Sequence, residues 1–92
     1  MTTYREIPDA LTARRDFKIG RECEGTANPV VVNQGHLDAD EFDRLDGALG
    51  RGLLEYIVYS HATPVAWVAD GRAYVVEQRV NRLLQDVCRN FL

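Results

Sequence analysis

Residues 53–77 constrain the fold more than any other part of the chain. They are rich in β-branched and aromatic residues, and Asp70-Gly71 interrupts them near their end. This dipeptide is typical of two-residue hairpin turns, because both turn positions take a positive φ. Pro64 fits the first position of a strand, where its missing N–H costs little. The pattern predicts an antiparallel meander of three strands, at 53–60, 65–69 and 72–77.

Alternation along these strands places apolar side chains on both faces of the sheet. Tyr56 and Val58 point to one face, whereas Ile57 and Tyr59 point to the other. A sheet with two apolar faces must be covered on both sides. If the two helices predicted before and after the meander cover one face, the other face needs the N-terminal residues or a second copy of the chain.

The helix before the meander is predicted to begin after Asp38 and to end near residue 50. Asp38 can cap its N-terminus, and Glu41 three residues later completes a variant of the capping box. Phe42, Leu45 and Leu49 recur at helical spacing and form its apolar face. Its many acids indicate a solvated outer face, which we favour over mimicry of nucleic-acid phosphates.

The helix after the meander is predicted over residues 78–92. Its apolar residues recur at intervals of three and four, which places them on one face. They are Val80, Leu83, Leu84, Val87, Cys88 and Phe91. The polar side of this helix carries three arginines, three and seven residues apart: Arg79, Arg82 and Arg89.

The first 28 residues have a weak pattern, which Gly20, Gly25 and Asn28 interrupt repeatedly. We therefore expect an irregular arm over 1–28 that docks partly on a single domain of residues 29–92. The three valines at 30–32 can add a short fourth strand. The predicted fold class is α+β, with a three-stranded antiparallel meander, this optional fourth strand and two flanking helices.

Composition narrows the biological setting. Ninety-two residues form one domain, and the net charge of −3 gives no bulk attraction to nucleic acid or anionic membranes. No apolar run approaches the roughly 20 residues of a membrane helix, and the N-terminus lacks the apolar core of a signal peptide. We expect a cytoplasmic protein without membrane contact. Cys23 and Cys88 lie far apart and outside any CxxC pattern, which predicts free thiols.

One stretch resembles a known family. Residues 56–67 have the sequence YIVYSHATPVAW, and Asp70-Gly71 follows. This stretch is similar to the signature Tyr-x-Val-Tyr-Ser-x-x-Thr-Pro-Val/Ile-Ala-Trp of small proteins from actinobacteria and their bacteriophages. Residues 11–17 also resemble the N-terminal region of that family, whereas the helix at 78–92 departs from its Ser/Thr-rich C-terminal segment. The family has no assigned activity, so the resemblance implies only a small accessory protein of bacteriophage origin.

The sequence contains no catalytic or metal motif. Ser60-His61 lacks an acid placed to orient the imidazole, so we interpret it as a loop serine beside an exposed histidine. No pair among the possible zinc ligands has ligand spacing; these are Cys23, His36, His61 and Cys88. No phosphate loop or dinucleotide fingerprint is present either. We therefore expect a protein that is not an enzyme and has no cofactor or metal.

Candidate residues for function are those that can contact a partner. Tyr59 and Trp67 can either pack in the core or anchor an interface. His61 lies at a loop tip, and the three arginines of the last helix can contact phosphates. The complete candidate set is Tyr59, His61, Trp67, Arg79, Arg82 and Arg89. Our first hypothesis is a protein-interaction module that binds a host or phage protein or a second copy of itself. The alternative is nucleic-acid binding through the arginines, which the net charge disfavours.

Overall fold

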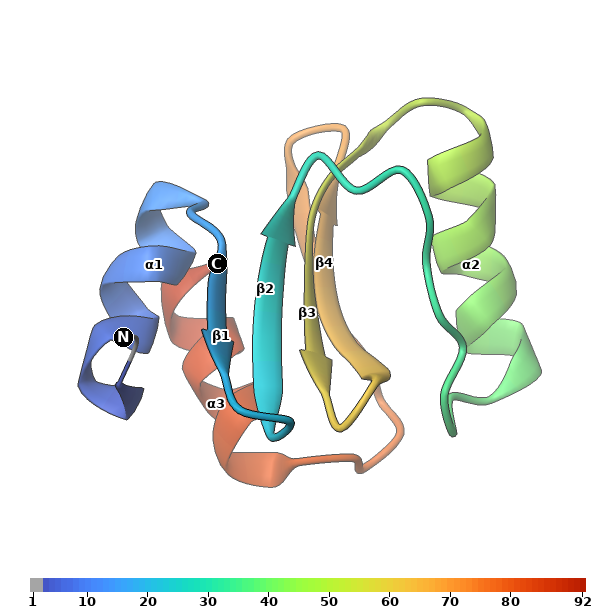
Figure 1. Ribbon diagram of the computed structural model, residues 1–92. Helices are drawn as coiled ribbons and strands as arrows, with labels where there is room; N and C mark the ends of the chain where they lie inside the picture. The colour runs from blue at the N-terminus through green and yellow to red at the C-terminus, as the bar shows by residue number, and fades with distance from the viewer. Residues whose placement is uncertain (1–2) are drawn as a thin grey trace.

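The computed structural model describes residues 3–92. Five strands form one antiparallel sheet in the order β1-β2-β3-β4-β5, so each strand pairs with its neighbour in the sequence (Figure 1). The strands are β1 (Phe17–Ile19), β2 (Cys23–Ala27), β3 (Leu54–Ser60), β4 (Thr63–Ala69) and β5 (Arg72–Val75). The helices are the 3-10 helix η1 (Tyr4–Glu6), α1 (Ile7–Ala13), α2 (Ala39–Gly50) and α3 (Arg82–Phe91).

The predicted α+β class and the three-stranded meander are confirmed by β3, β4 and β5. The turn between β4 and β5 has the predicted form, with φ of 53° at Asp70 and 74° at Gly71. The turn between β3 and β4 is tighter than predicted. It contains only His61 and Ala62, both with positive φ, and Ser60 pairs directly with its partner at the start of β4. The second strand of the meander therefore begins two residues earlier than the sequence indicated.

The prediction of an irregular arm over residues 1–28 was wrong for the residues that form α1, β1 and β2, and α1 is a third helix beside the two predicted. Register places Cys23 opposite Ser60 and Ala27 opposite Tyr56, so β2 pairs with β3 over its full length. Local propensity missed this strand because its pairing with β3 on one side and β1 on the other stabilises it. Residues from both sides of the predicted boundary at 28/29 lie in one sheet. Met1 and Thr2, the first residues of that predicted arm, lie outside the described residues.

Gly25 is a packing residue rather than the chain breaker that the sequence indicated. It lies in β2 opposite Phe17, and a Cβ at this position would overlap the Phe17 ring and the Tyr56 hydroxyl. That hydroxyl donates a hydrogen bond of 2.7 Å to the carbonyl oxygen of Arg15. The glycine therefore lets an aromatic ring and a tyrosine lie against the backbone of β2.

Both faces of the sheet are covered by the chain itself. In Figure 1, α1 and α3 lie on one side of the sheet and α2 lies on the other. Tyr56 and Val58 pack with Leu11 of α1 and Cys88 of α3 in the first core. The second core is formed by α2 and the opposite sheet face, and includes Leu45, Ile57, Trp67 and Val76. The two predicted helices thus lie on opposite faces rather than on one, and α1, from the N-terminal residues, adds to the cover beside α3. The sheet does not need a second copy for this purpose.

The predicted fourth strand at residues 30–32 does not form. β3 already pairs with β2 on one edge and with β4 on the other, so no sheet edge is free at this position. The valines instead lie in the connection from β2 to α2, where Val30 is 88% exposed and Val31 is 65% exposed. The backbone N–H of Asn33 donates a 3.1 Å hydrogen bond to the Tyr59 hydroxyl and fixes this connection to the sheet.

The predicted helix starts differ in detail from the observed ones. Asp38 occupies the N-cap position of α2, but its side chain forms no capping hydrogen bond. Glu41, expected to complete a capping box, instead accepts a hydrogen bond from the Tyr74 hydroxyl. α3 begins at Arg82, four residues later than predicted, and the side chain of Asn81 accepts a hydrogen bond from the backbone N–H of Leu84.

Candidate functional site

Several of the predicted contact residues meet at one end of the sheet. The β1–β2 turn, the β3–β4 turn and the loop before α3 all lie at the lower end of the molecule in Figure 1. Three hollows with volumes of about 400, 270 and 320 Å³ lie along these segments. His61 lines the first and the third, and Arg79 lines the second and the third. The hollows are therefore neighbours that share these two side chains.

The structure brings the three predicted arginines together around the hollow of about 270 Å³, which we call the arginine hollow. Its walls include Arg79, Arg82 and Arg89, with Glu77 and Asp86 beside them. Arg89 forms an ion pair of 2.8 Å with Asp86, the only one found in the described part of the chain. Exposed surface pairs of this kind contribute about 0–1 kcal/mol to stability. The guanidinium groups of Arg79 and Arg82 thus remain open to an anionic partner.

Gln85 forms the floor of the arginine hollow. This residue belongs to α3 and lines the hollow, although its side chain is buried. Its side-chain oxygen accepts hydrogen bonds from the backbone N–H groups of Val80 and Asn81. Its amide nitrogen donates to the carbonyl oxygens of Val76 and Gln78. These bonds hold the loop that carries Arg79 against the start of α3.

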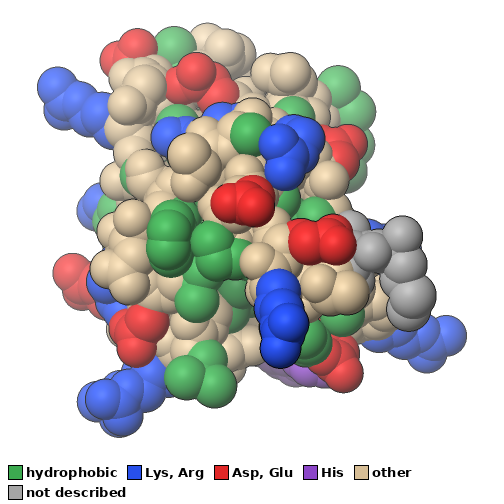
Figure 2. Space-filling view, turned by 90° about the vertical axis from the view of Figure 1, so that its left-hand side faces the viewer, with side chains coloured by type: hydrophobic (Ala, Val, Ile, Leu, Met, Phe, Trp, Pro, Cys, Tyr) green, Lys and Arg blue, Asp and Glu red, His purple; other side chains and the backbone are tan. Residues whose placement is uncertain are grey.

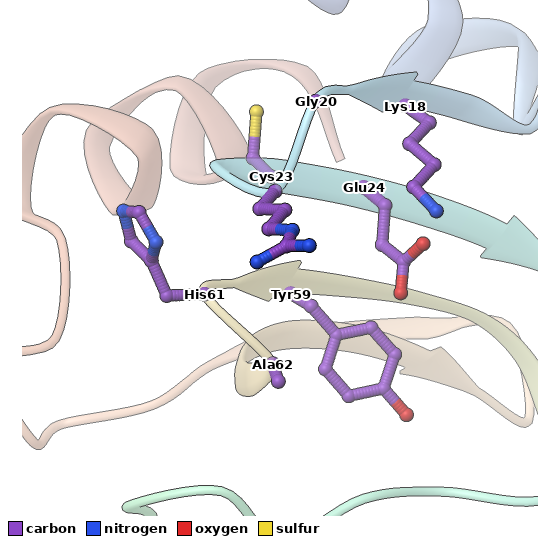
Figure 3. A pocket seen from close by; sticks show the side chains of 8 residues that line it. Lys18, Gly20, Cys23, Glu24, Tyr59, His61 and Ala62 are labelled. Carbon is purple, nitrogen blue, oxygen red and sulfur yellow. The ribbon is translucent and has the colours of Figure 1, made fainter.

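The hollow of about 400 Å³ lies between the β1–β2 and β3–β4 turns, and we call it the turn hollow. Lys18, Glu24 and Tyr59 lie side by side on three neighbouring strands, because the register pairs Lys18 with Glu24 and Glu24 with Tyr59. Figure 3 shows their side chains on one side of the sheet. Arg21 and His61 complete the lining from the two turns. The candidate His61 therefore lies at a wall of this hollow, exposed as expected.

Tyr59 and Trp67, the aromatic candidates, belong to the core beneath α2. Trp67 is only 2% exposed, and its ring lies 4.9 Å from that of Tyr74. Tyr59 is also buried, and burial raises the pKa of its hydroxyl. Of the two roles that the sequence left open for these residues, core packing is the one observed. Trp67 is not accessible to a partner in this conformation, and Tyr59, only 5% exposed, reaches the surface as part of the lining of the turn hollow.

A polar contact that the sequence did not indicate joins α2 to β5. The Tyr74 hydroxyl donates a hydrogen bond of 2.6 Å to Oε1 of Glu41, and the guanidinium carbon of Arg44 lies 4.6 Å from the centre of the Tyr74 ring. Burial and the bond to Glu41 raise the pKa of Tyr74 to about 12. The second oxygen of Glu41 is buried without a hydrogen-bond partner. This contact holds two elements together rather than forming an open site.

Two exposed apolar residues on α3 are the surface feature that sequence reasoning missed. Leu83 is 80% exposed and Phe91 is 42% exposed, although both belong to the stripe predicted to be core. Leu84 and Cys88 alone are fully buried among the stripe residues of α3. Leu83, Val87 and Phe91 form a separate row at four-residue spacing beside that buried pair, and Val87 in its middle is partly buried against the first core. Figure 2 looks onto this side of the molecule and shows apolar side chains gathered near its middle.

Neither a metal centre nor a known relative helps to assign a function. Within residues 3–92, no three His, Cys, Asp or Glu side chains are grouped so that they could hold a metal ion. No helix over the same residues has the length and apolar character to cross a bilayer. Comparisons with protein-family models, curated proteins and solved structures gave no match. The resemblance to actinobacterial and phage proteins rests on the short stretches described above.

Proposed function

We propose that this protein is a small non-enzymatic accessory protein that binds another protein through the outer side of α3. The observation that carries this proposal is the pair of exposed apolar side chains Leu83 and Phe91, with the partly buried Val87 between them at four-residue spacing. Apolar side chains at four-residue spacing are the usual anchors of a helix that packs against a partner. Leaving Leu83 in water gives up the roughly 1.5–3 kcal/mol that full burial of such a side chain contributes.

The charge beside this row indicates what kind of partner fits. Arg82 directly precedes Leu83, and its guanidinium lines the arginine hollow together with that of Arg79. Arginine is enriched at protein interfaces, where its planar group binds carboxylates through two hydrogen bonds. The proposed partner therefore presents an apolar helix or groove with carboxylates at its border. In the bacteriophage setting proposed from residues 56–67, this partner is a host or phage protein in the host cytoplasm, or a second copy.

Two exposed-residue variants test the proposal against a matched control. Leu83→Ser and Phe91→Ser remove the row, whereas Val31→Ser removes another exposed apolar side chain, 65% exposed and far from α3 in the sequence. Light scattering over a concentration series detects a second copy, and crosslinking mass spectrometry in an actinobacterial lysate detects another partner. We expect at least a tenfold loss of association in the α3 variants, as for other interface anchors, and none in V31S. A wild-type protein that stays monomeric and crosslinks to nothing through α3 would refute the proposal.

A second candidate function is nucleic-acid binding, which the convergence of three arginines on one hollow favours. Such binding depends on neutralising phosphates and so weakens steeply with salt. We expect a mobility shift at low salt that Arg79→Gln/Arg82→Gln abolishes and that Arg72→Gln, on β5, retains. Absence of a shift at low salt would exclude this candidate.

A further inference from the structure

We infer that the turn hollow is a binding site for a small organic oxyanion, a carboxylate or phosphate monoester. It has a volume of about 400 Å³, within the range of about 300–1,000 Å³ typical of small-molecule pockets. None of its lining residues belongs to α3, so the inference is independent of the partner surface proposed above.

Charge is the first argument for an oxyanion. Lys18 and Arg21 both line the turn hollow, with Glu24 as the single acid in the lining, in a protein whose net charge is −3. Lys18 is directly opposite Glu24 on the neighbouring strand, yet the two form no ion pair within 4 Å. The Lys18 ammonium and the Arg21 guanidinium are therefore free to bind an anion, the guanidinium through paired hydrogen bonds.

The backbone of the β3–β4 turn is the second argument. His61 has φ of 47° and Ala62 has φ of 66°, in a region that is unfavourable for residues other than glycine. The other two-residue turn of the sheet avoids part of this strain with Gly71. The backbone N–H of His61 donates a 2.9 Å hydrogen bond to the carbonyl oxygen of Glu22, which fixes the two turns relative to each other. Both positions of a two-residue hairpin turn take a positive φ, so this geometry belongs to the turn itself. The bond to Glu22 keeps the turn, and with it one wall of the turn hollow, in place before a ligand binds.

The remaining lining limits the ligand class. The Tyr59 side chain forms one wall, and its hydroxyl is fixed by the bond from Asn33 described above, so it offers an aromatic surface rather than a free proton donor. Cys23 also borders the hollow, but Figure 3 shows its sulfur on the opposite side of the sheet from Tyr59. This thiol is buried in the core beneath α1 and α3. The site therefore fits reversible binding of an anion with a small flat group rather than covalent chemistry.

Titration of the ¹⁵N-labelled protein with three probes at constant ionic strength tests the inference. The probes are phenyl phosphate, benzoate and inorganic phosphate, with benzyl alcohol as the neutral control. We expect saturable amide shifts centred on residues 18–24 and 59–62 with phenyl phosphate, benzoate or both, and none there with benzyl alcohol. Whichever of phenyl phosphate and benzoate binds more tightly shows whether the site prefers a phosphate or a carboxylate ligand.

Matched variants separate this site from general charge attraction. Arg21→Gln and Lys18→Gln alter exposed side chains, and each weakens binding of the anionic probes at least about tenfold if these cations hold the anion. Arg72→Gln removes an exposed arginine from β5 and leaves binding unchanged. Shifts that do not saturate, that centre on residues 79–89, or that respond equally to R21Q and R72Q would overturn the inference. Binding of benzyl alcohol as strong as that of benzoate would also overturn it.

Discussion

At the scale of single residues, Gln85 shows how one side chain fixes a surface. It is buried and forms four hydrogen bonds to the backbone of residues 76–81, at 2.9–3.0 Å. Its amide uses both its donor and its acceptor groups, so the buried polar group is fully satisfied. Because this loop carries Arg79, the geometry of the arginine hollow depends on Gln85.

Gln85→Ala is expected to lower the free energy of unfolding by about 3 kcal/mol, because several backbone groups lose their partners and some of them stay buried. Gln34→Ala is the matched control, since exposed Gln34 donates a single hydrogen bond to Leu37. We expect that control to cost less than about 1 kcal/mol. Urea unfolding measures both values, and equal losses in the two variants would contradict the role assigned to Gln85.

Replacing Gly25 or Gly47 by alanine is expected to change the stability of the protein in opposite directions. Gly25→Ala places a methyl group against Phe17 and Tyr56, and overpacking of this kind costs about 1–3 kcal/mol. Gly47→Ala, in α2, meets no atom within 4 Å and gains up to about 1 kcal/mol of helix propensity. Thermal unfolding should thus show shifts of opposite sign. A stabilised G25A protein would mean that the β2 packing described above is incorrect.

At the scale of elements, α2 contacts the sheet through an apolar core and through the Tyr74–Glu41 hydrogen bond. The bond connects the first turn of α2 to β5, the last strand of the sheet. It holds the Tyr74 hydroxyl neutral, because an ionised phenol beside a carboxylate is unfavourable. Burial, together with the hydrogen bond to Glu41 and the charge of its carboxylate, raises the pKa of Tyr74 from 10 to about 12.

Tyr74→Phe is expected to cost about 1–2 kcal/mol at pH 7, because Glu41 then loses its only hydrogen-bond donor. A raised pKa in the folded state means that this contribution is fully present below pH 10 and is lost as the pH rises towards 12. The difference in stability between wild type and Y74F should therefore shrink from pH 10 upward. Urea unfolding at pH 7, 10 and 11 checks this, with Tyr4→Phe on exposed Tyr4 as control. A difference that stays constant across this range would argue against the bond.

At the scale of the whole molecule, both thiols lie in the core that α1 and α3 form with the sheet. Burial raises the pKa of Cys88 to about 12 and also raises that of Cys23. The thiolate is the reactive form, so neither cysteine reacts readily in the folded protein. Labelling then requires the opening of the core, and its rate reports on global stability.

Thiol labelling at pH 8 is expected to be at least about 100-fold slower in the native protein than in urea, since both burial and the raised pKa suppress the thiolate. Gln85→Ala should speed labelling in proportion to its loss of stability, whereas Gln34→Ala should change it little. Fast labelling of the wild type with an unchanged amide spectrum would show that the core opens locally instead.

The elements that have a local sequence pattern could be predicted from the sequence alone. The meander of β3, β4 and β5 followed from alternation and Asp70-Gly71, and α2 and α3 followed from helical spacing, since these patterns depend on neighbours within a few residues. The arginine set was also predicted, because helical spacing places Arg82 and Arg89 on one side of the helix.

Which sheet edges and helix faces are covered, and which stay exposed, follows from the tertiary structure alone. β2 forms a strand because it pairs with the free edge of β3. Residues 30–32 form no strand, because β2 already occupies that edge. Contact with the sheet buried Leu84 and Cys88 and left Leu83 and Phe91 exposed. The turn hollow likewise required two distant turns to meet. These outcomes depend on pairing and packing between residues far apart in the chain, which local propensity does not contain.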